Sequence, residues 1–316
     1  MIRSPRTGSA PTVASADGVE CHALTKRFGA FTAVDTLTFA APMGQVTGFV
    51  GANGAGKTTT MRMLLGLAEP TSGSALVGGR RLRDVENPRR LVGPVLDSPG
   101  AHPGQSGRAH LRVQAAAAGI SDRRVDQVLE MVNLTYAANR RSGAYSLGMR
   151  QRLSIATAML GDPRVILFDE PTKGLDPPGI IWLRDFMRDL ADQGRCVFVS
   201  SHNLGELEAI ADRVVMIDHG RLVADATLAD LLTRGASAVM VSTPQAERLA
   251  AAVRLRGGSV EEVGPEDLRI SRLDSLAIGE IAMEERIALR ALTDERQDLE
   301  VVYQHLTNAK PRGGQS

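Results

Sequence analysis

The chain has 316 residues, which is enough for two domains, at least one of them with a full hydrophobic core. Lysine and arginine number 37 and aspartate and glutamate 36, so the basic excess of a protein that coats nucleic acid is missing, and we expect no nucleic-acid partner. No apolar run approaches the roughly 18 residues of a membrane-spanning helix, so work at a membrane would require a separate spanning subunit.

Residues 1–17 are rich in Ser, Thr, Pro, Ala and Gly and lack the apolar core of a signal peptide. We expect a disordered tail there and another at 309–316. A transit peptide is the alternative, but Pro5 and Pro11 would interrupt its amphipathic helix. Cys21 and Cys196 show neither metal nor redox spacing, which predicts reduced thiols and a cytosolic compartment.

The first domain is expected to open with two antiparallel strands. Apolar and polar residues alternate over 19–24 and 34–39, with a Lys-Arg-Phe-Gly turn between them. Phe28 lies on this turn, where an exposed aromatic ring could stack on an adenine. A core phenylalanine at a strand end is an equal alternative at this point.

A phosphate loop follows. Residues 51–59 read Gly-Ala-Asn-Gly-Ala-Gly-Lys-Thr-Thr and fit the pattern G-x-x-x-x-G-K-[ST], with an apolar strand before them and helix formers at 61–67 after them. Such a loop wraps phosphates with backbone amides, while its lysine reaches the terminal phosphates and its threonine faces magnesium. The candidate ATP-binding residues are Gly51, Asn53, Gly54, Ala55, Gly56, Lys57, Thr58 and Thr59.

The next segment predicts a helical lobe over about 100–160. A strand at 92–96 is followed by a Pro- and Gly-rich loop and by helical stretches at 109–118 and 125–132. A further helix begins after Ser146, a plausible N-cap, and runs to about Leu160. A lobe inserted in this way could serve as a docking surface.

A buried strand at 165–170 ends in two carboxylates. If it belongs to a parallel sheet, Asp169 lies at the edge where ligands bind and is a candidate magnesium ligand, and Glu170 is a candidate general base. Either could instead be a solvated strand-end acid or a helix cap. His202 follows the strand at 195–200 and could contact the γ-phosphate or simply cap the next helix. A turn-rich stretch at 171–178 and a helix at 179–192 lie between the two strands.

The sheet of the domain over 18–233 is expected to close with strands at 213–218 and 222–224, before a short helix at 228–232. The pattern then restarts over 234–308. Its order is strand 238–242, helix 244–255, strands 259–263 and 268–271, helix 276–286, strand 287–292 and a last helix 298–306, which predicts a ferredoxin-like, split βαβ domain. No catalytic constellation occurs in it, so we expect a regulatory or assembly role.

Taken in order, these motifs over 19–233 resemble the ATP-binding subunit of an ABC transporter, an α/β phosphate-loop NTPase fold. By this resemblance, 51–59 is Walker A, 165–170 is Walker B with Glu170 as the catalytic glutamate, and His202 is the switch histidine. Phe28 becomes the adenine-stacking aromatic, and 174–177 the D-loop with Asp176. The signature residues, which face the ATP of a partner subunit, are Ser146, Gly148, Met149 and Gln151.

Two positions depart from the family pattern. The signature usually reads Ser-Gly-Gly-Gln, whereas Leu147 replaces its first glycine here. Asp97 stands where the family carries a magnesium-linking glutamine, and a carboxylate there can still ligate a hard cation. The Ser-Leu-Gly-Met signature, the run at 170–177 and the C-terminal extension look most like the export-type subfamily (ABC-2), which includes antibiotic-resistance and drug-efflux pumps.

The resemblance implies ATP and Mg²⁺ as ligands and a head-to-tail homodimer that encloses two ATP molecules. It also implies a separate multispanning permease, a peripheral place on the cytoplasmic side of the membrane, and export of a drug, antibiotic or lipid-like molecule. Two alternatives are a soluble ABC-type ATPase and a regulatory module that binds ATP without hydrolysing it. Tandem cassettes and coiled-coil insertions, which are usual in the soluble class, are not visible, and Glu170 and His202 argue against the second alternative.

Overall fold

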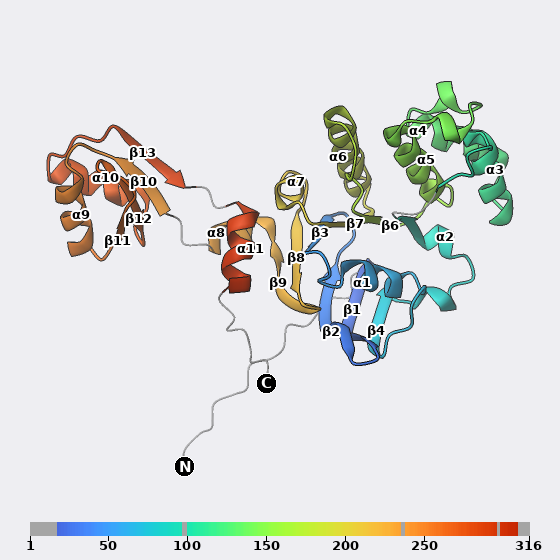
Figure 1. The fold of residues 1–316 in the computed structure, drawn as a ribbon, viewed down its shortest axis with the longest axis horizontal. Helices are drawn as coiled ribbons and strands as arrows, with labels where there is room; N and C mark the ends of the chain where they lie inside the picture. Colours follow the sequence, from blue (N-terminus) through green and yellow to red (C-terminus); the bar gives the residue numbers. More distant parts are fainter. Residues whose placement is uncertain (1–17, 97–99, 235–237, 296–297, 309–316) are drawn as a thin grey trace, which may run out of the picture. The chain divides into compact units, whose positions relative to one another are not determined.

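The computed structural model describes residues 18–96, 100–234, 238–295 and 298–308. The chain forms two compact units, one ending at Asp225 and the other beginning at Ala226 (Figure 1). The division falls within strand β9 (Arg221–Thr227), whereas the sequence suggested a boundary after Thr233. No helix among the described residues combines the length and the apolar character needed to cross a bilayer.

The first unit opens with a three-stranded antiparallel sheet in the order β2-β1-β4. Strands β1 (Val19–Phe28) and β2 (Phe31–Ala41) form the predicted hairpin. The third strand, β4 (Ser72–Val77), was not predicted, because its Ser-Gly-Ser start resembles a turn. Gly73 is needed there: it has φ +78°, and a Cβ would lie 2.2 Å from the carbonyl oxygen of Ala23 on β1.

A six-stranded sheet forms the centre of the first unit. Its order is β5 (Val92–Val95), β6 (Val165–Asp169), β7 (Cys196–Ser201), β3 (Val46–Val50), β8 (Arg213–Asp218) and β9. The first five strands are parallel, and β3, β6 and β7 are fully buried, which explains their continuous apolar sequences. Parallel strands bring their carboxyl ends to one edge, where the functional side chains gather.

Helix α1 (Lys57–Leu64) packs on strands of both sheets, and α6 (Pro177–Asp192) packs on β3 and β7. The two sheets share one hydrophobic core. Three phenylalanines join them: the ring centroid of Phe39 on β2 lies 5.4 Å from that of Phe49 and 5.6 Å from that of Phe198. Phe49 of β3, the strand that leads into the phosphate loop, therefore packs against both β2 and β7.

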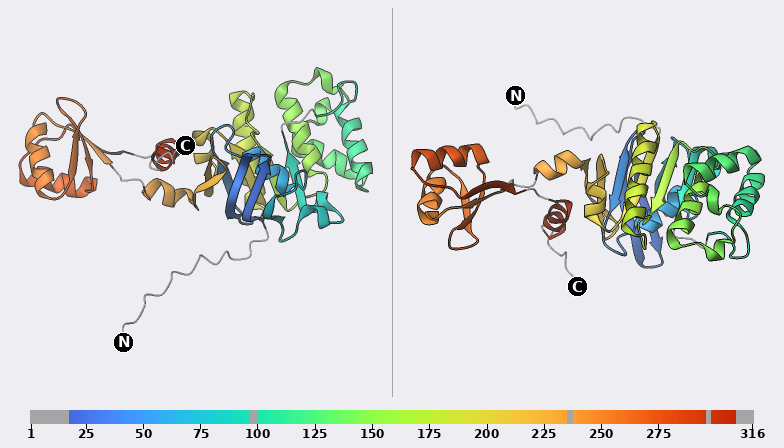
Figure 2. Two further views of the ribbon diagram at one scale, coloured as in Figure 1. Left: turned by 60° about the horizontal axis from the view of Figure 1, so that its bottom comes forward. Right: turned by 90° about the horizontal axis from the view of Figure 1, so that it is seen from above.

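The helical lobe consists of α3 (Gly107–Ala117), α4 (Asp122–Met131) and α5 (Leu147–Met159), which pack against one another. Both views of Figure 2 show these helices, in teal and green, together at one end of the first unit. Each begins at a serine whose side chain accepts a hydrogen bond from the helix backbone. The shorter helices of the unit are η1 (Leu82–Asp84), α2 (Pro88–Leu91), η2 (Thr135–Ala137), η3 (Ser142–Ala144) and α7 (Leu204–Glu208).

The second unit contains a four-stranded antiparallel sheet in the order β11-β12-β10-β13, with two helices on one face, as the predicted split βαβ pattern requires. Its elements are α8 (Leu228–Arg234), β10 (Ala238–Ser242), α9 (Ala246–Leu255), β11 (Ser259–Glu262), β12 (Asp267–Ser271), α10 (Ser275–Glu284), β13 (Ala291–Glu295) and α11 (Leu299–Asn308). The last strand begins four residues later than predicted. Arg286 turns the chain at φ +52°, and Ile287 is buried in the core as a loop residue.

Candidate nucleotide-binding site

The phosphate loop connects β3 to α1, and two of its glycines have no room for a side chain. A Cβ on Gly51 would lie 2.5 Å from the carbonyl oxygen of Ile217. Gly56 has φ +106°, and a Cβ there would lie 2.6 Å from the carbonyl oxygen of Ala33. Glycine is therefore required at these two positions because neighbouring backbone lies too close for a side chain.

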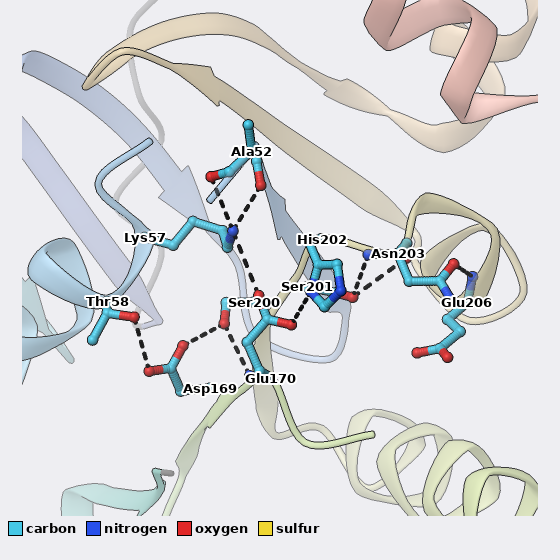
Figure 3. Close-up of polar contacts among 11 residues, drawn as sticks. Ala52, Lys57, Thr58, Asp169, Glu170, Ser200, Ser201, His202, Asn203 and Glu206 are labelled. Atoms are coloured by element: carbon cyan, nitrogen blue, oxygen red, sulfur yellow. Dashed lines mark hydrogen bonds and ion pairs between the residues drawn. The ribbon is translucent and has the colours of Figure 1, made fainter. Parts of the chain in front are cut away.

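Lys57 is the first residue of α1 and is only 6% exposed. Its ammonium donates hydrogen bonds to the carbonyl oxygens of Gly51, at 2.7 Å, and Ala52, at 3.3 Å. The same ammonium lies 3.5 Å from Oε1 of Glu170 (Figure 3). The Lys57 ammonium is thus held between the loop and a carboxylate, where nucleotide phosphates can replace its present acceptors.

Asp169 ends β6 and is nearly buried, at 7% exposure. Its Oδ2 accepts a hydrogen bond from Thr58 Oγ1 at 3.2 Å, and its Oδ1 accepts one from Ser200 Oγ at 2.6 Å. Ser200 is the register partner of Asp169 on β7, so the parallel pairing itself fixes this contact. A hydroxyl and a carboxylate side by side are the hard oxygen donors that Mg²⁺ prefers, so these residues fit that ion.

Glu170 is held at both ends. Its backbone has φ +49°, which is uncommon for a residue with a Cβ, and its N–H donates to the carbonyl oxygen and to Oγ of Ser200 at 3.2 and 3.1 Å. At the other end, Oε2 lies 2.6 Å from Nδ1 of His202, just past β7 (Figure 3). The Glu170 carboxylate thus lies between the Lys57 ammonium and the His202 ring.

These side chains border one cavity of about 960 Å³, at the upper end of the range of small-molecule sites. The predicted residues that line it are Asn53, Gly54, Gly56, Lys57, Thr58, Thr59, Asp169, Glu170 and His202. Gly51, the first residue of the loop, accepts a hydrogen bond from Lys57 through its carbonyl oxygen, and Ala55 is part of the hydrophobic core. The cavity therefore brings together the Lys57 ammonium, the oxygens of Thr58 and Asp169 that suit Mg²⁺, and the carboxylate of Glu170.

Phe28, the predicted adenine-stacking residue, does not line this cavity. Its ring is 56% exposed, and the ammonium of Lys26 lies 5.0 Å from the ring centroid. Its cross-strand partner Phe31 lines the cavity instead and is 64% exposed. The two aromatic rings thus belong to one hairpin end, and Phe31 is a second candidate for contact with a nucleobase.

The signature residues lie on another element. Ser146 caps α5 by accepting a hydrogen bond from the Met149 N–H at 3.2 Å, as the sequence predicted, and Gly148 and Gln151 follow in the first turns. None of the four signature residues is among the described residues that line the cavity. Asp176 accepts a hydrogen bond from Gly179 N at 3.1 Å and caps α6. Asp97 lies outside the described residues.

Leu147, the departure from the usual signature, packs toward the D-loop. A Cβ on Gly174 would lie 2.4 Å from Leu147 Cδ2, and one on Gly148 would lie 3.8 Å from Leu175 Cδ2. Gly174 has φ +75°, so it needs to be glycine for its backbone as well. The substituted position therefore adds an apolar contact between α5 and the turn before α6.

Sequence reasoning missed two residues of the site. Ser200 was placed at the strand end, but the hydrogen bond from its hydroxyl to Asp169 was not foreseen, although two neighbouring parallel strands with adjacent ends were enough to suggest it. Phe31 was missed because both aromatics flank one turn, and the sequence does not tell which ring faces the loop.

Comparison with known proteins shows that the chain belongs to the ATP-binding proteins of ABC transporters. The ABC transporter family matches residues 34–173, and a domain of unknown function (DUF8746) matches 237–300. The Bacitracin transport ATP-binding protein BcrA of Enterococcus faecalis is 37% identical over 219 residues, covering 68% of this chain and 71% of that protein. The protein of the same name from Bacillus licheniformis is 41% identical over 203 residues, covering 63% of this chain and 66% of that protein.

Another relative, the Uncharacterized ABC transporter ATP-binding protein YhcH of Bacillus subtilis, is 38% identical and covers 65% of this chain and 68% of its own length. A solved structure of the ATP-binding subunit of an ABC transporter superposes with a TM-score of 0.62 at 31% identity, over 68% of this chain and 92% of that chain. A dimeric cassette bound to ADP and phosphate shares the fold, with a TM-score of 0.60 at 22% identity, over 66% of this chain and 98% of that one.

Proposed function

Because the chain belongs to the ATP-binding proteins of ABC transporters, an ATPase family, we propose that it hydrolyses ATP as one half of a homodimer that drives a separate export permease. One observation carries the proposal. The carboxylate of Glu170 lies between Lys57, at 3.5 Å, and His202, at 2.6 Å, in the same cavity as the phosphate loop.

In this mechanism the loop amides and Lys57 bind the β- and γ-phosphates. Glu170 accepts a proton from the water that attacks the γ-phosphorus, while His202 keeps the carboxylate in place through its Nδ1 contact. Thr58 and Asp169 would hold Mg²⁺, which supplies positive charge beside the phosphates, and Asp97 is proposed as a further ligand. ADP and inorganic phosphate are the products.

The separation of two sets of residues supports the proposed homodimer. Within one chain, Ser146 and Gly148 begin α5 and do not line the cavity of the described residues. In a head-to-tail pair, the signature of each copy would face the ATP held by the other, and both sites would be completed at once. The α5 N-terminus offers backbone N–H groups and an exposed serine toward a γ-phosphate.

The names of the relatives support a role in transport and the proposed class of cargo. Two of them are named as bacitracin transport proteins, and the Lantibiotic transport ATP-binding protein SrtF of Streptococcus pyogenes is 35% identical over 202 residues. We propose that this chain works at the cytoplasmic side of the membrane with a multispanning permease, and that the cargo is an antibiotic, drug or lipid-like molecule. The second unit is proposed to regulate or assemble this complex.

The test is purification of the tagged Glu170→Gln variant from its own cells in mild detergent with ATP. This substitution removes the proposed base, so ATP stays bound and the closed dimer should accumulate. We expect a multispanning membrane protein to copurify, and to do so less in a Lys57→Ala control that cannot hold phosphates. Recovery of ribosomes, DNA or assembly factors without a membrane protein would place the chain among soluble ABC-type ATPases.

A further inference from the structure

A small hollow of about 10 Å³ is bordered by α6, α7 and the carboxyl end of β7. Two of its lining residues adjoin the proposed catalytic pair: Pro171 directly follows Glu170, and Ser201 directly precedes His202. Glu170 and His202 themselves line the larger nucleotide cavity. The hollow therefore borders the chain next to both partners of the Glu170–His202 contact.

Two side chains of opposite charge line this hollow, Arg184 from α6 and Glu206 from α7. Nε of Arg184 and Oε2 of Glu206 are shielded from solvent, and neither atom has a hydrogen-bond partner among the described residues. The neighbouring side chains in the lining are buried and apolar, among them Met187, Val199 and Leu207. Because a buried donor or acceptor without a partner costs free energy, these two atoms require a group that bridges them.

This pair differs from the other arginines whose buried Nε has no partner. Arg124, Arg188 and Arg213 form ion pairs with aspartates through their remaining guanidinium nitrogens. Arg184 and Glu206 form no ion pair with any described residue, so each faces only the opposite charge across the hollow.

The size and the lining of the hollow suit one water molecule. A site for water needs roughly 10–15 Å³ and two to four polar partners. Nε of Arg184 can donate a hydrogen bond to the water, and Oε2 of Glu206 can accept one from it. The hydroxyl residues Thr172 and Ser201 also belong to the lining. An organic ligand is too large for this volume.

Glu206 is joined by hydrogen bonds to the residues around His202. Its N–H donates to Asn203 Oδ1 at 3.2 Å, and the Asn203 N–H donates to Ser201 Oγ at 2.9 Å (Figure 3). The side chain of His202 is 56% exposed, so its own packing does little to hold the ring. Since α6 packs on β7, a link from Arg184 to Glu206 would tie the turn that carries His202 to the sheet domain.

We propose that one water molecule bridges Arg184 Nε and Glu206 Oε2, and that this bridge makes Glu206 a positioning residue for His202. The Arg184 N–H donates to the water oxygen, and a water O–H donates to the Glu206 carboxylate, so both buried atoms gain a partner. The effect on catalysis rests on the proposed ATP hydrolysis, whereas the bridge itself does not.

Crystal structures of the parent and of Glu206→Met test the bridge independently of ATP hydrolysis. In the parent we expect a water molecule within about 3.2 Å of both atoms. In the variant we expect the 2.6 Å contact between His202 Nδ1 and Glu170 Oε2 to be lost, because α7 is no longer tied to α6. A direct ion pair between Arg184 and Glu206 in the parent, or an unchanged His202–Glu170 contact in the variant, would overturn the proposal.

Steady-state ATP hydrolysis measures the consequence for catalysis. We expect Glu206→Met to lower kcat by about tenfold and to leave KM for ATP unchanged, because the ring is displaced while the phosphate loop is untouched. Glu206→Gln keeps an oxygen at the same place and should retain most of the parent kcat. Glu247→Met, at an exposed position of α9, is the matched control and should hydrolyse ATP at the parent rate. Urea unfolding checks that each variant is folded.

Two double variants decide whether the effect passes through the bridge and through His202. Arg184→Met/Glu206→Met should be no slower than the slower single variant, since either change alone breaks the bridge. His202→Ala/Glu206→Met should be no slower than His202→Ala. Multiplicative losses in either pair would overturn the proposal. A parent that does not hydrolyse ATP would instead overturn the proposed function, and the crystal structures would still decide on the bridge.

Discussion

The guanidinium carbon of Arg152 lies 3.8 Å from the centroid of the Trp182 ring. Arg152 belongs to α5, the helix that begins with the signature, and Trp182 belongs to α6, which begins at the D-loop. Arg152 also donates a hydrogen bond to the carbonyl oxygen of Val132 at 2.9 Å, and Trp182 stacks on Phe186 at 5.3 Å. The lobe is therefore joined to the sheet domain by a cation–π contact.

Trp182→Leu should loosen this connection. It removes the ring face beneath Arg152, and we expect the free energy of unfolding to fall by about 1–2 kcal/mol, of which the cation–π contact supplies part. Trp182→Phe retains an aromatic face and should lose less. Urea unfolding of the three proteins checks the order. Equal losses for Leu and Phe would show that the aromatic face does not contribute.

Glu170→Gln should lower the ATP hydrolysis rate by about 10²- to 10⁴-fold, the contribution typical of a general base. ATP affinity should change little, because the amide keeps the size and position of the side chain. Turnover and nucleotide binding are measured on the same preparation. Asp185→Asn, at an exposed position of α6, is the matched control and should hydrolyse ATP at the parent rate. Parent-rate hydrolysis by Glu170→Gln would remove Glu170 from the role of base.

His202→Ala should act through Glu170, since Nδ1 of His202 contacts its Oε2 at 2.6 Å. We expect a rate loss of about 10²-fold, and we expect the double variant with Glu170→Gln to be no slower than Glu170→Gln alone. A double-mutant cycle of turnover rates measures this coupling. Fully multiplicative losses would mean that His202 acts independently, for example by a direct contact with the γ-phosphate.

Ser200→Ala removes a buried hydroxyl that donates to Asp169 at 2.6 Å and accepts from the Glu170 N–H at 3.1 Å. Because the lost bond is to a buried carboxylate, the free energy of unfolding should fall by about 1.5–3 kcal/mol. Hydrolysis should also need more Mg²⁺ for half-maximal rate, since Asp169 loses the contact that orients it. Ser259→Ala, on an exposed strand position, should show neither effect in urea unfolding or in magnesium titration.

Asp212 links three elements. Burial raises the pKa of its carboxyl, but hydrogen bonds from Arg188 and from the Val46 N–H lower it by more, so this pKa lies below its ordinary value. A lowered native pKa contributes stability above the unfolded pKa of about 4, and that stability is lost as pH falls through the native pKa.

The stability gap between the parent and Asp212→Asn should therefore be widest near neutral pH and should close below about pH 4. Urea unfolding at a series of pH values measures it. Asp189→Asn, at an exposed site on α6, should show no such gap. A gap that is constant with pH would show that the loss comes from the amide's poorer fit and not from the lowered pKa.

Local pattern was enough to predict most of the fold. Three features could be read from neighbouring residues alone. They are the alternation in β1 and β2, the continuous apolar runs of β3, β6 and β7, and the serine cap of α5. Strand β4 was missed because the glycine at its start is required by a tertiary contact with β1. Gly73 permits two backbones to approach, and that requirement looks like a turn signal when only neighbours in sequence are considered.

The site shows the same limit. Lys57, Asp169 and Glu170 could be named because motif spacing fixes them relative to a strand end. The exchange of Phe28 for Phe31 in the cavity lining could not be foreseen, since it depends on how the end of a hairpin twists over the loop. The Glu170–His202 contact likewise required two strands to be placed side by side.

Both cysteines of the chain lie in the core between the sheets. Burial raises the pKa of the Cys196 thiol to about 12 and, together with the charge of Glu20, also raises the pKa of Cys21 well above its usual range. Neither thiolate forms at neutral pH, so the native protein should resist alkylating reagents. A cysteine introduced at an exposed position such as Tyr136 or Leu276 would then be the only labelling site. Spectroscopic probes could therefore follow domain movements during turnover without removal of the natural cysteines.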